Sequence, residues 1–188
     1  MSPRSVLLVL GITALLAVGL YGYTKLLARV GSGTPPMAAA AASLADHIVV
    51  SKADKAMYLF RDDRILRRYR ISMGSNWKDG HKQREGDERT PEGAYVIDWR
   101  NPNSMAHLSL HISYPNAADQ EAARRQGYHP GGNIMIHGLP NGWGALGAIH
   151  HLLDWTDGCI AVSNAEMREI WSLVPNGTPI EIHARWQP

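Results

Sequence analysis

The chain opens on an apolar run that has no polar face. Residues 6–21 are almost wholly apolar, and Thr13 carries the one clearly polar side chain. A run of this length predicts a transmembrane helix or a signal segment, because a core helix of a soluble domain would be amphipathic. We expect residues 1–30 to be an uncleaved membrane anchor. A cleaved signal is the alternative, although the small residues at 37–43 lie far downstream of the run.

Positive charges flank the apolar run about equally, with Arg4 before it and Lys25 and Arg29 after it, so they do not fix its orientation. Residues 31–44 are rich in Gly, Pro and Ala, which predicts a linker. We expect the folded domain to cover residues 45–185.

Short apolar runs between turn residues then predict a mainly β domain. Alternation is clearest at 107–113, where Leu108, Leu110 and Ile112 share one face. The expected strands are 47–51, 56–60, 64–73, 93–99, 107–113, 133–137, 159–162 and 179–183. One helix is expected at 117–126, between Asn116 and Gly127, and another begins at Ser163, which forms a capping box with Glu166. Two modest helices among many strands favour a β-rich α+β sandwich or barrel.

Composition removes several classes of function. The net charge of +2 is too small to predict a nucleic-acid partner. A single cysteine among 188 residues excludes an intramolecular disulfide and a cysteine-based zinc site. His107 and His111 are four residues apart, but on a strand their side chains lie roughly 13 Å apart. A two-ligand metal site from this pair is therefore not expected.

The lone cysteine and one histidine form the candidate catalytic pair. Gly158 directly precedes Cys159, which allows a sharp turn and leaves backbone N–H groups for a developing oxyanion. Taken alone, Cys159 is as well explained as a buried core thiol. His137 ends an apolar strand, where a base that activates a thiol is well placed. The cysteine and the histidine together indicate nucleophilic catalysis more strongly than either residue alone.

Other polar residues are candidates for binding substrate. The charged loop 80–93 is either a solvated loop or a substrate wall, and its Arg84 and Arg89 are suited to carboxylates. His151 is a further candidate for lining the site.

Three blocks in order resemble the YkuD-type L,D-transpeptidases, and within them the YafK-like branch. They are Arg89-Thr90-Pro91-Glu92-Gly93-Ala94-Tyr95, Ile136-His137-Gly138 and Thr156-Asp157-Gly158-Cys159-Ile160. The resemblance implies a β-rich fold in the bacterial cell envelope, anchored in the inner membrane with its domain in the periplasm or secreted there. It implies that Cys159 attacks a peptidoglycan stem peptide at meso-diaminopimelate and releases D-Ala.

The same resemblance assigns roles to individual residues. His137 is the proton acceptor and donor, and the N–H groups of Gly158 and Cys159 face the oxyanion. Gly138, Thr156 and Asp157 belong to the matching blocks and are expected to contact substrate. The acyl group then passes to an amine on another stem, to a lipoprotein lysine, or to water. The resemblance also implies that the enzyme uses no metal and no other cofactor.

Two features depart from the family pattern. Asp157 and Ala161 occupy positions where many members have His and Arg. We expect Asp157 to point away from the sulfur or to pair with a cation, because its charge would otherwise raise the pKa of the thiol. The Cys–His spacing is also long, and the extra residues lie in the Gly-rich stretch 140–153, which is a candidate lid.

Three functions remain open on the sequence. The first is a transpeptidase, and the second is a carboxypeptidase or amidase that uses the same pair with water. The third, from another class, is a non-catalytic envelope-binding module in which Cys159 is structural.

Overall fold

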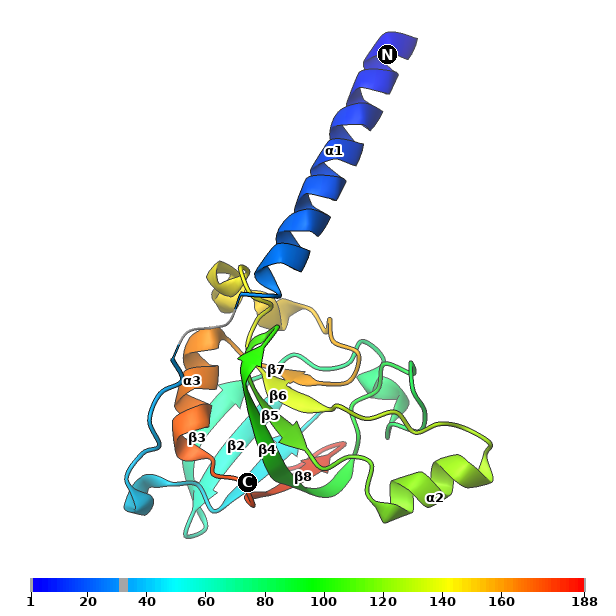
Figure 1. Cartoon of the computed structure of the whole chain (residues 1–188). Helices are drawn as coiled ribbons and strands as arrows, with labels where there is room; N and C mark the ends of the chain where they lie inside the picture. Colours follow the sequence, from blue (N-terminus) through cyan, green and yellow to red (C-terminus); the bar gives the residue numbers. More distant parts are fainter. Residues whose placement is uncertain (1, 31–33, 188) are drawn as a thin grey trace.

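A computed structural model describes residues 2–30 and 34–187. An apolar helix, α1 (Pro3–Leu27), stands out from a β-rich domain (Figure 1). Its 25 residues are long and apolar enough to cross a membrane, a test that a signal sequence also passes. Within the expected linker, residues 31–33 lie outside the described residues.

Eight strands form one curled sheet in the order β3-β2-β1-β8-β4-β5-β6-β7. The strands are β1 (His47–Ser51), β2 (Ala56–Arg61), β3 (Arg64–Arg70), β4 (Gly93–Ser104), β5 (His107–Ile112), β6 (Met135–His137), β7 (Ile160–Ala161) and β8 (Pro179–His183). The pairs β1–β8 and β6–β7 are parallel, and the other neighbours are antiparallel. The predicted mainly β fold is confirmed.

Two helices in the domain begin at side-chain caps. In α3 (Asn164–Leu173), Ser163 and Glu166 form the predicted capping box. The buried side chains of α3 join the main core, which includes Leu108, Leu110 and Ile112 of β5. The other helix, α2 (Ala117–Arg125), begins at Asn116 and projects from the domain (Figure 1). The core thus fixes β5, and β5 in turn pairs with β6, which carries His137.

Strand β4 extends five residues beyond the predicted end at 99. Its outer half pairs with β5 through two register shifts, so the strand continues with bulges through residues 101–103. The stretch 140–153 contains two short 3-10 helices, η3 (Gly144–Ala148) and η4 (His150–Leu152). Both lie on the side of the domain from which α1 emerges (Figure 1).

Candidate active site

The adjacent strands β6 and β7 bring Cys159 and His137 to one cavity. Cys159 directly precedes β7, and its Sγ accepts a hydrogen bond from the Met135 N–H at 3.4 Å. Met135 lies two residues before His137, so the two side chains lie on the same face of β6. Cys159 and His137 both line a cavity of about 610 Å³. The predicted pair is therefore brought together in space.

A hydrogen bond to the next residue fixes the tautomer of His137. Its Nδ1 lies 2.6 Å from the Gly138 carbonyl oxygen, which can only accept. Nδ1 must therefore carry the proton, and Nε2 keeps a free lone pair. Burial lowers the pKa of His137, the Gly138 carbonyl partly offsets this effect, and nearby His150 lowers the pKa further. The ring is thus neutral at pH 7, the form that accepts a proton.

The thiol is protonated in the resting site. Burial raises the pKa of Cys159, the Met135 N–H opposes this rise, and the Asp157 charge adds to it. Among the described residues, the hydrogen bonds of Sγ go to Met135 N and the Asn133 carbonyl oxygen, and not to His137. The site therefore holds a thiol beside a neutral imidazole rather than a preformed ion pair.

Asp157 does not behave as expected. It lines the cavity of Cys159 and also a second cavity of about 730 Å³, and Asn133 is likewise shared by both. Its charge helps to raise the pKa of the Cys159 thiol, and no ion pair to Asp157 occurs in residues 2–30 and 34–187. A carboxylate thus stands at the boundary of the two cavities.

Thr156 holds the turn before the cysteine. Its side chain is buried, and its Oγ1 donates to the Cys159 carbonyl oxygen at 2.7 Å while accepting from the Gly158 N–H at 3.3 Å. This bond occupies the Gly158 N–H that was expected to face the oxyanion. The Cys159 N–H is the remaining candidate of the two. Although Thr156 lines the cavity, its hydroxyl acts within the protein.

Gly158 is required by its surroundings. Its φ of +125° is one that residues with a side chain rarely adopt, and a Cβ there would lie 2.5 Å from the Arg89 carbonyl oxygen. Gly138 is also enclosed, because a Cβ there would lie 2.7 Å from Asn164 Oδ1. Gly138 therefore positions His137 through its carbonyl instead of lining the cavity.

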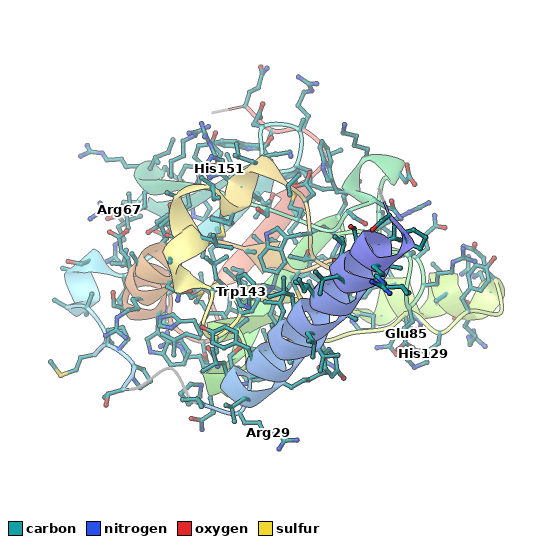
Figure 2. All side chains as sticks on the ribbon, turned by 90° about the horizontal axis from the view of Figure 1, so that it is seen from above. Arg29, Arg67, Glu85, His129, Trp143 and His151 are labelled. Carbon is teal, nitrogen blue, oxygen red and sulfur yellow. The ribbon has the colours of Figure 1, made fainter. Side chains whose placement is uncertain are left out.

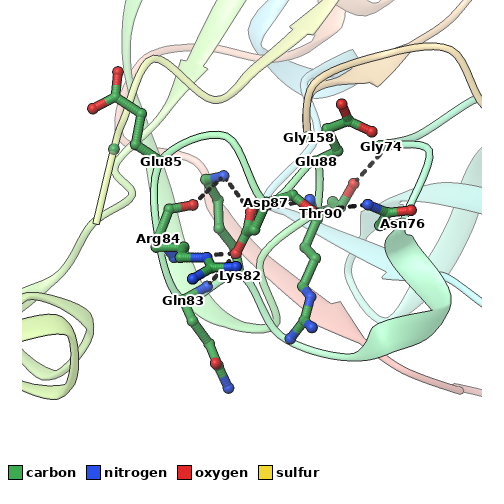
Figure 3. A network of polar contacts seen from close by, with 12 residues as sticks. Gly74, Asn76, Lys82, Gln83, Arg84, Glu85, Asp87, Glu88, Thr90 and Gly158 are labelled. Carbon is green, nitrogen blue, oxygen red and sulfur yellow. Dashed lines mark hydrogen bonds and ion pairs between the residues drawn. The ribbon is translucent and has the colours of Figure 1, made fainter. Parts of the chain in front are cut away.

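The charged loop 80–93 is an ordered support for the nucleophile turn (Figure 3). Lys82 and Asp87 form an ion pair at 2.7 Å whose side chains are 3% and 6% exposed. Asp87 also accepts from three backbone N–H groups, those of Gln83, Arg84 and Arg89. The ion pair fixes the loop whose Arg89 carbonyl packs against Gly158.

A buried lysine holds the loop from its other side. Lys52 Nζ donates to the carbonyl oxygens of Gly80 and Thr90 and to the Glu92 carboxylate. Neither Lys52 nor the Lys82–Asp87 pair was singled out from the sequence. A buried charged residue and a solvated one look alike in the amino-acid sequence, so the burial of these residues could not be predicted from it.

Three predicted binding residues lie outside the cavity of Cys159. Arg84 and Arg89 line a separate polar cavity, where the Arg84 guanidinium lies 5.1 Å from the centre of the Tyr128 ring. His151, which belongs to η4, bonds to Arg70 at 2.9 Å and lines another cavity. None of the three side chains lines the cavity of Cys159, and their contact with substrate stays a prediction.

The cavity has walls that the sequence did not predict. Trp155 lies edge-on to His137, with ring centres 5.8 Å apart. Ser109 faces His137 across the β5–β6 ladder, and its buried hydroxyl has no protein partner among the described residues. Lys25 belongs to a third wall, from the last turn of α1, which also contributes Thr24 and Ala28. Within residues 2–30 and 34–187, no cluster of His, Cys, Asp or Glu is suited to a metal ion.

Comparison with known proteins identifies the family. The L,D-transpeptidase catalytic domain family, YkuD, matches residues 45–182. The chain belongs to this family. The chain is also 31% identical over 133 residues to the protein named "Putative L,D-transpeptidase YafK" of Escherichia coli (strain K12). That match covers 62% of this chain and 45% of YafK, so the chain spans less than half of that relative.

Two solved structures share the fold. The helical cell shape determining protein Pgp2 from Campylobacter jejuni aligns with a TM-score of 0.53 and 26% identity, over 78% of this chain and 52% of Pgp2. An L,D-transpeptidase from Mycobacterium smegmatis aligns with a TM-score of 0.50 and 14% identity, over 74% of this chain and 59% of its own. The second likeness shows the fold alone.

Proposed function

We propose that this protein is a peptidoglycan L,D-transpeptidase that forms a thioester at Cys159. The observation that carries the proposal is the joint position of Cys159 and a neutral His137, whose Nε2 is free, in one cavity. A protonated thiol needs such a base before it becomes a nucleophile.

The protonation states define the order of the reaction. His137 Nε2 takes the thiol proton while Sγ bonds to the carbonyl carbon of meso-diaminopimelate in the donor stem. The oxyanion that forms is stabilised by the Cys159 N–H. The C–N bond to the terminal D-Ala then breaks, and the departing amine receives the proton from His137. An acceptor amine then attacks the thioester carbonyl and gives a proton to His137. The C–S bond breaks, the acyl group stays on the amine, and the Cys159 thiol regains its proton.

The cavity that contains Cys159 adjoins a second cavity at Asn133 and Asp157, and this pair of cavities favours a transferase over a hydrolase. The cavity shared with His137 is largely apolar, whereas the second carries Lys82, Glu88 and His129, charges that suit a zwitterionic stem peptide. A transpeptidase must hold two stems at once, one on each side of the thioester. A carboxypeptidase needs room for one stem and a water molecule.

We place this activity at the outer face of the cytoplasmic membrane. Helix α1 has the length and composition of a membrane span, and none of its residues is buried in the protein. The substrate lies outside the cytoplasm, so an uncleaved α1 would hold the domain in the periplasm. A mature protein that lacks residues 1–30 in cell fractions would show instead that the segment is a signal.

Labelling of the intact protein tests the nucleophile. A carbapenem or iodoacetamide should add to Cys159, and Cys159→Ser should abolish both the adduct and turnover. His137→Ala should abolish turnover with the fold intact, whereas His151→Ala, the matched control outside the cavity, should retain it. If the wild-type protein shows no turnover, Cys159→Ala keeps the biological function and the thiol resists both reagents, the protein is the non-catalytic module instead.

Product analysis tests the acceptor. Purified muropeptides are incubated with the full chain in detergent, and products are identified by mass spectrometry. New cross-linked dimers are expected for the transpeptidase. Trimmed stems without dimers would instead identify a carboxypeptidase.

A further inference from the structure

The segment 139–153, called the docking segment below, exposes apolar side chains without any charge. It contains no Asp, Glu, Lys or Arg in fifteen consecutive positions. Leu152 and Leu153 are 68% and 71% exposed, and Leu146 and Ile149 are exposed beside them. Its two histidines turn toward the protein, where His150 bonds to Ser72 and His151 to Arg70. A soluble surface rarely gathers apolar groups in this way without a partner.

The docking segment is packed against the last turns of α1 (Figure 2). Trp143 lies edge-on to Tyr23 with ring centres 6.3 Å apart, and the Tyr23 hydroxyl donates to the Gly142 carbonyl oxygen at 3.3 Å. Asn141 Nδ2 donates to the Val30 carbonyl oxygen at 2.8 Å just beyond the helix. The apolar surface of the segment is therefore continuous with that of α1.

The charges on α1 locate the membrane boundary. Arg4 and Lys25 are separated by about 32 Å along the axis, at 1.5 Å per residue. This separation matches a hydrocarbon core about 30 Å thick. Tyr21 and Tyr23 then fall at the interface, where aromatic side chains gather. Because Trp143 touches Tyr23, the docking segment begins at the same depth.

We propose that the docking segment lies in the lipid headgroup region of the bilayer that α1 crosses. Leu146, Ile149, Leu152 and Leu153 reach the acyl boundary, as the apolar face of an interfacial helix does. A shallow apolar hollow of about 280 Å³ beneath them is framed by Trp143, Leu153 and Trp155. The cavity of Cys159 consequently opens at the membrane surface. This inference rests on the proposed anchoring of α1.

The occupant is lipid because the apolar surface begins where the span ends. The docking segment and the end of α1 lie at the same depth, so both meet the same lipid environment. A second protein would have to cover the segment while avoiding the bilayer beside it. The absence of formal charge along the segment also fits the headgroup–acyl boundary better than a polar protein rim.

Depth measurement by spin labelling tests the docking. The full chain, with Cys159→Ser to leave no native thiol, is labelled after Leu152→Cys and reconstituted in vesicles of phosphatidylethanolamine and phosphatidylglycerol. Matched labels are placed by Gly11→Cys in the middle of α1 and by Ile65→Cys, an exposed apolar position on β3. Accessibility to oxygen and to the water-soluble complex NiEDDA is measured at each site. The oxygen-to-NiEDDA ratio at Leu152 should be several-fold that at Ile65.

The labels separate failure of docking from failure of anchoring. If the Gly11 label is in lipid and the Leu152 label is as water-accessible as that at Ile65, the docking is overturned and the anchoring stands. If the Leu152 label is shielded from both reagents, protein covers the segment and the docking is again overturned. If the Gly11 label is water-accessible, the anchoring fails and the docking with it.

A second variant checks that the label itself does not insert the segment. With the label placed by Ile149→Cys, the double change Leu152→Asp and Leu153→Asp should bring the oxygen-to-NiEDDA ratio down to the Ile65 value. An unchanged ratio at Ile149 would contradict the proposed insertion.

Discussion

The buried ion pair in loop 80–93 gives a quantitative prediction through Asp87→Asn. One oxygen of Asp87 accepts from Lys82 Nζ and Arg89 N, and the other accepts from Gln83 N and Arg84 N. Both oxygens face donors, so an Asn amide places its NH₂ against donors in either orientation. The substitution thus removes two hydrogen bonds and leaves the Lys82 charge buried without its counter-ion.

The expected loss of stability follows from that geometry. Breaking a buried pair by removing one partner costs about 3–5 kcal/mol. Lys82 keeps one acceptor, the Arg84 carbonyl oxygen at 3.1 Å, so we expect the lower end, about 3 kcal/mol. For a domain of this size that loss lowers the melting temperature by roughly 6–12 °C. Turnover should also fall, because the loop carries the Arg89 carbonyl that packs against Gly158.

Thermal and urea unfolding of the full chain in detergent, followed by circular dichroism, measures this loss. The matched control is Glu85→Gln in the same loop, whose carboxylate is 73% exposed and paired with an exposed histidine. An exposed pair contributes at most about 1 kcal/mol, so the control should be close to wild type. An Asp87→Asn protein as stable as Glu85→Gln would refute the reasoning.

Three further predictions concern the same site. Burial raises the pKa of Asp87, but Lys82 and the three backbone N–H groups lower it further, so the net folded pKa lies below the unfolded value of about 3.9. The ionised carboxylate therefore stabilises the fold fully above about pH 3.9, and this stabilisation is lost as the pH falls through the folded pKa. In urea titrations, the stability difference between wild type and Asp87→Asn should be constant from pH 7 to about 5 and shrink below about 3.9, and a difference that widens in acid would contradict this sign. Removing the charge in Asp157→Asn should lower the pKa of Cys159, so the pH profile of iodoacetamide alkylation should move to lower pH, whereas the remote Asp79→Asn should not move it. Gly158→Ala combines strain with a clash and should abolish turnover, whereas Gly177→Ala, with φ of +90° and open space around it, should cost about 1 kcal/mol and retain activity.

Much of the sheet could be predicted because alternation and turns are local signals. The last strand has the predicted bounds, and Ser163 caps α3 as its sequence indicated. The same alternation places Ser109 on the face of β5 opposite Leu108 and Leu110. It is 1% exposed, because that face also forms part of the cavity wall.

The sequence predicted the residues of the candidate site only where these residues lie at the ends of strands. His137 and Cys159 belong to adjacent strands, so their proximity follows from the pairing of β6 and β7. Arg84 and Arg89 lie in a loop, where no period sets side-chain direction, and they face another cavity. The pairing of Lys82 with Asp87, five residues further along, depends on how the loop folds over itself.

The wall that α1 gives to the cavity has a consequence for inhibitor discovery. A soluble fragment beginning at Ala45 would keep Cys159 and His137 but lack Thr24 and Lys25. Its cavity would be a trough open on one side, and compounds selected on it would be matched to a shape that differs from that of the whole chain. Screening the full chain in nanodiscs would reach ligands that bridge the thiol and the helix.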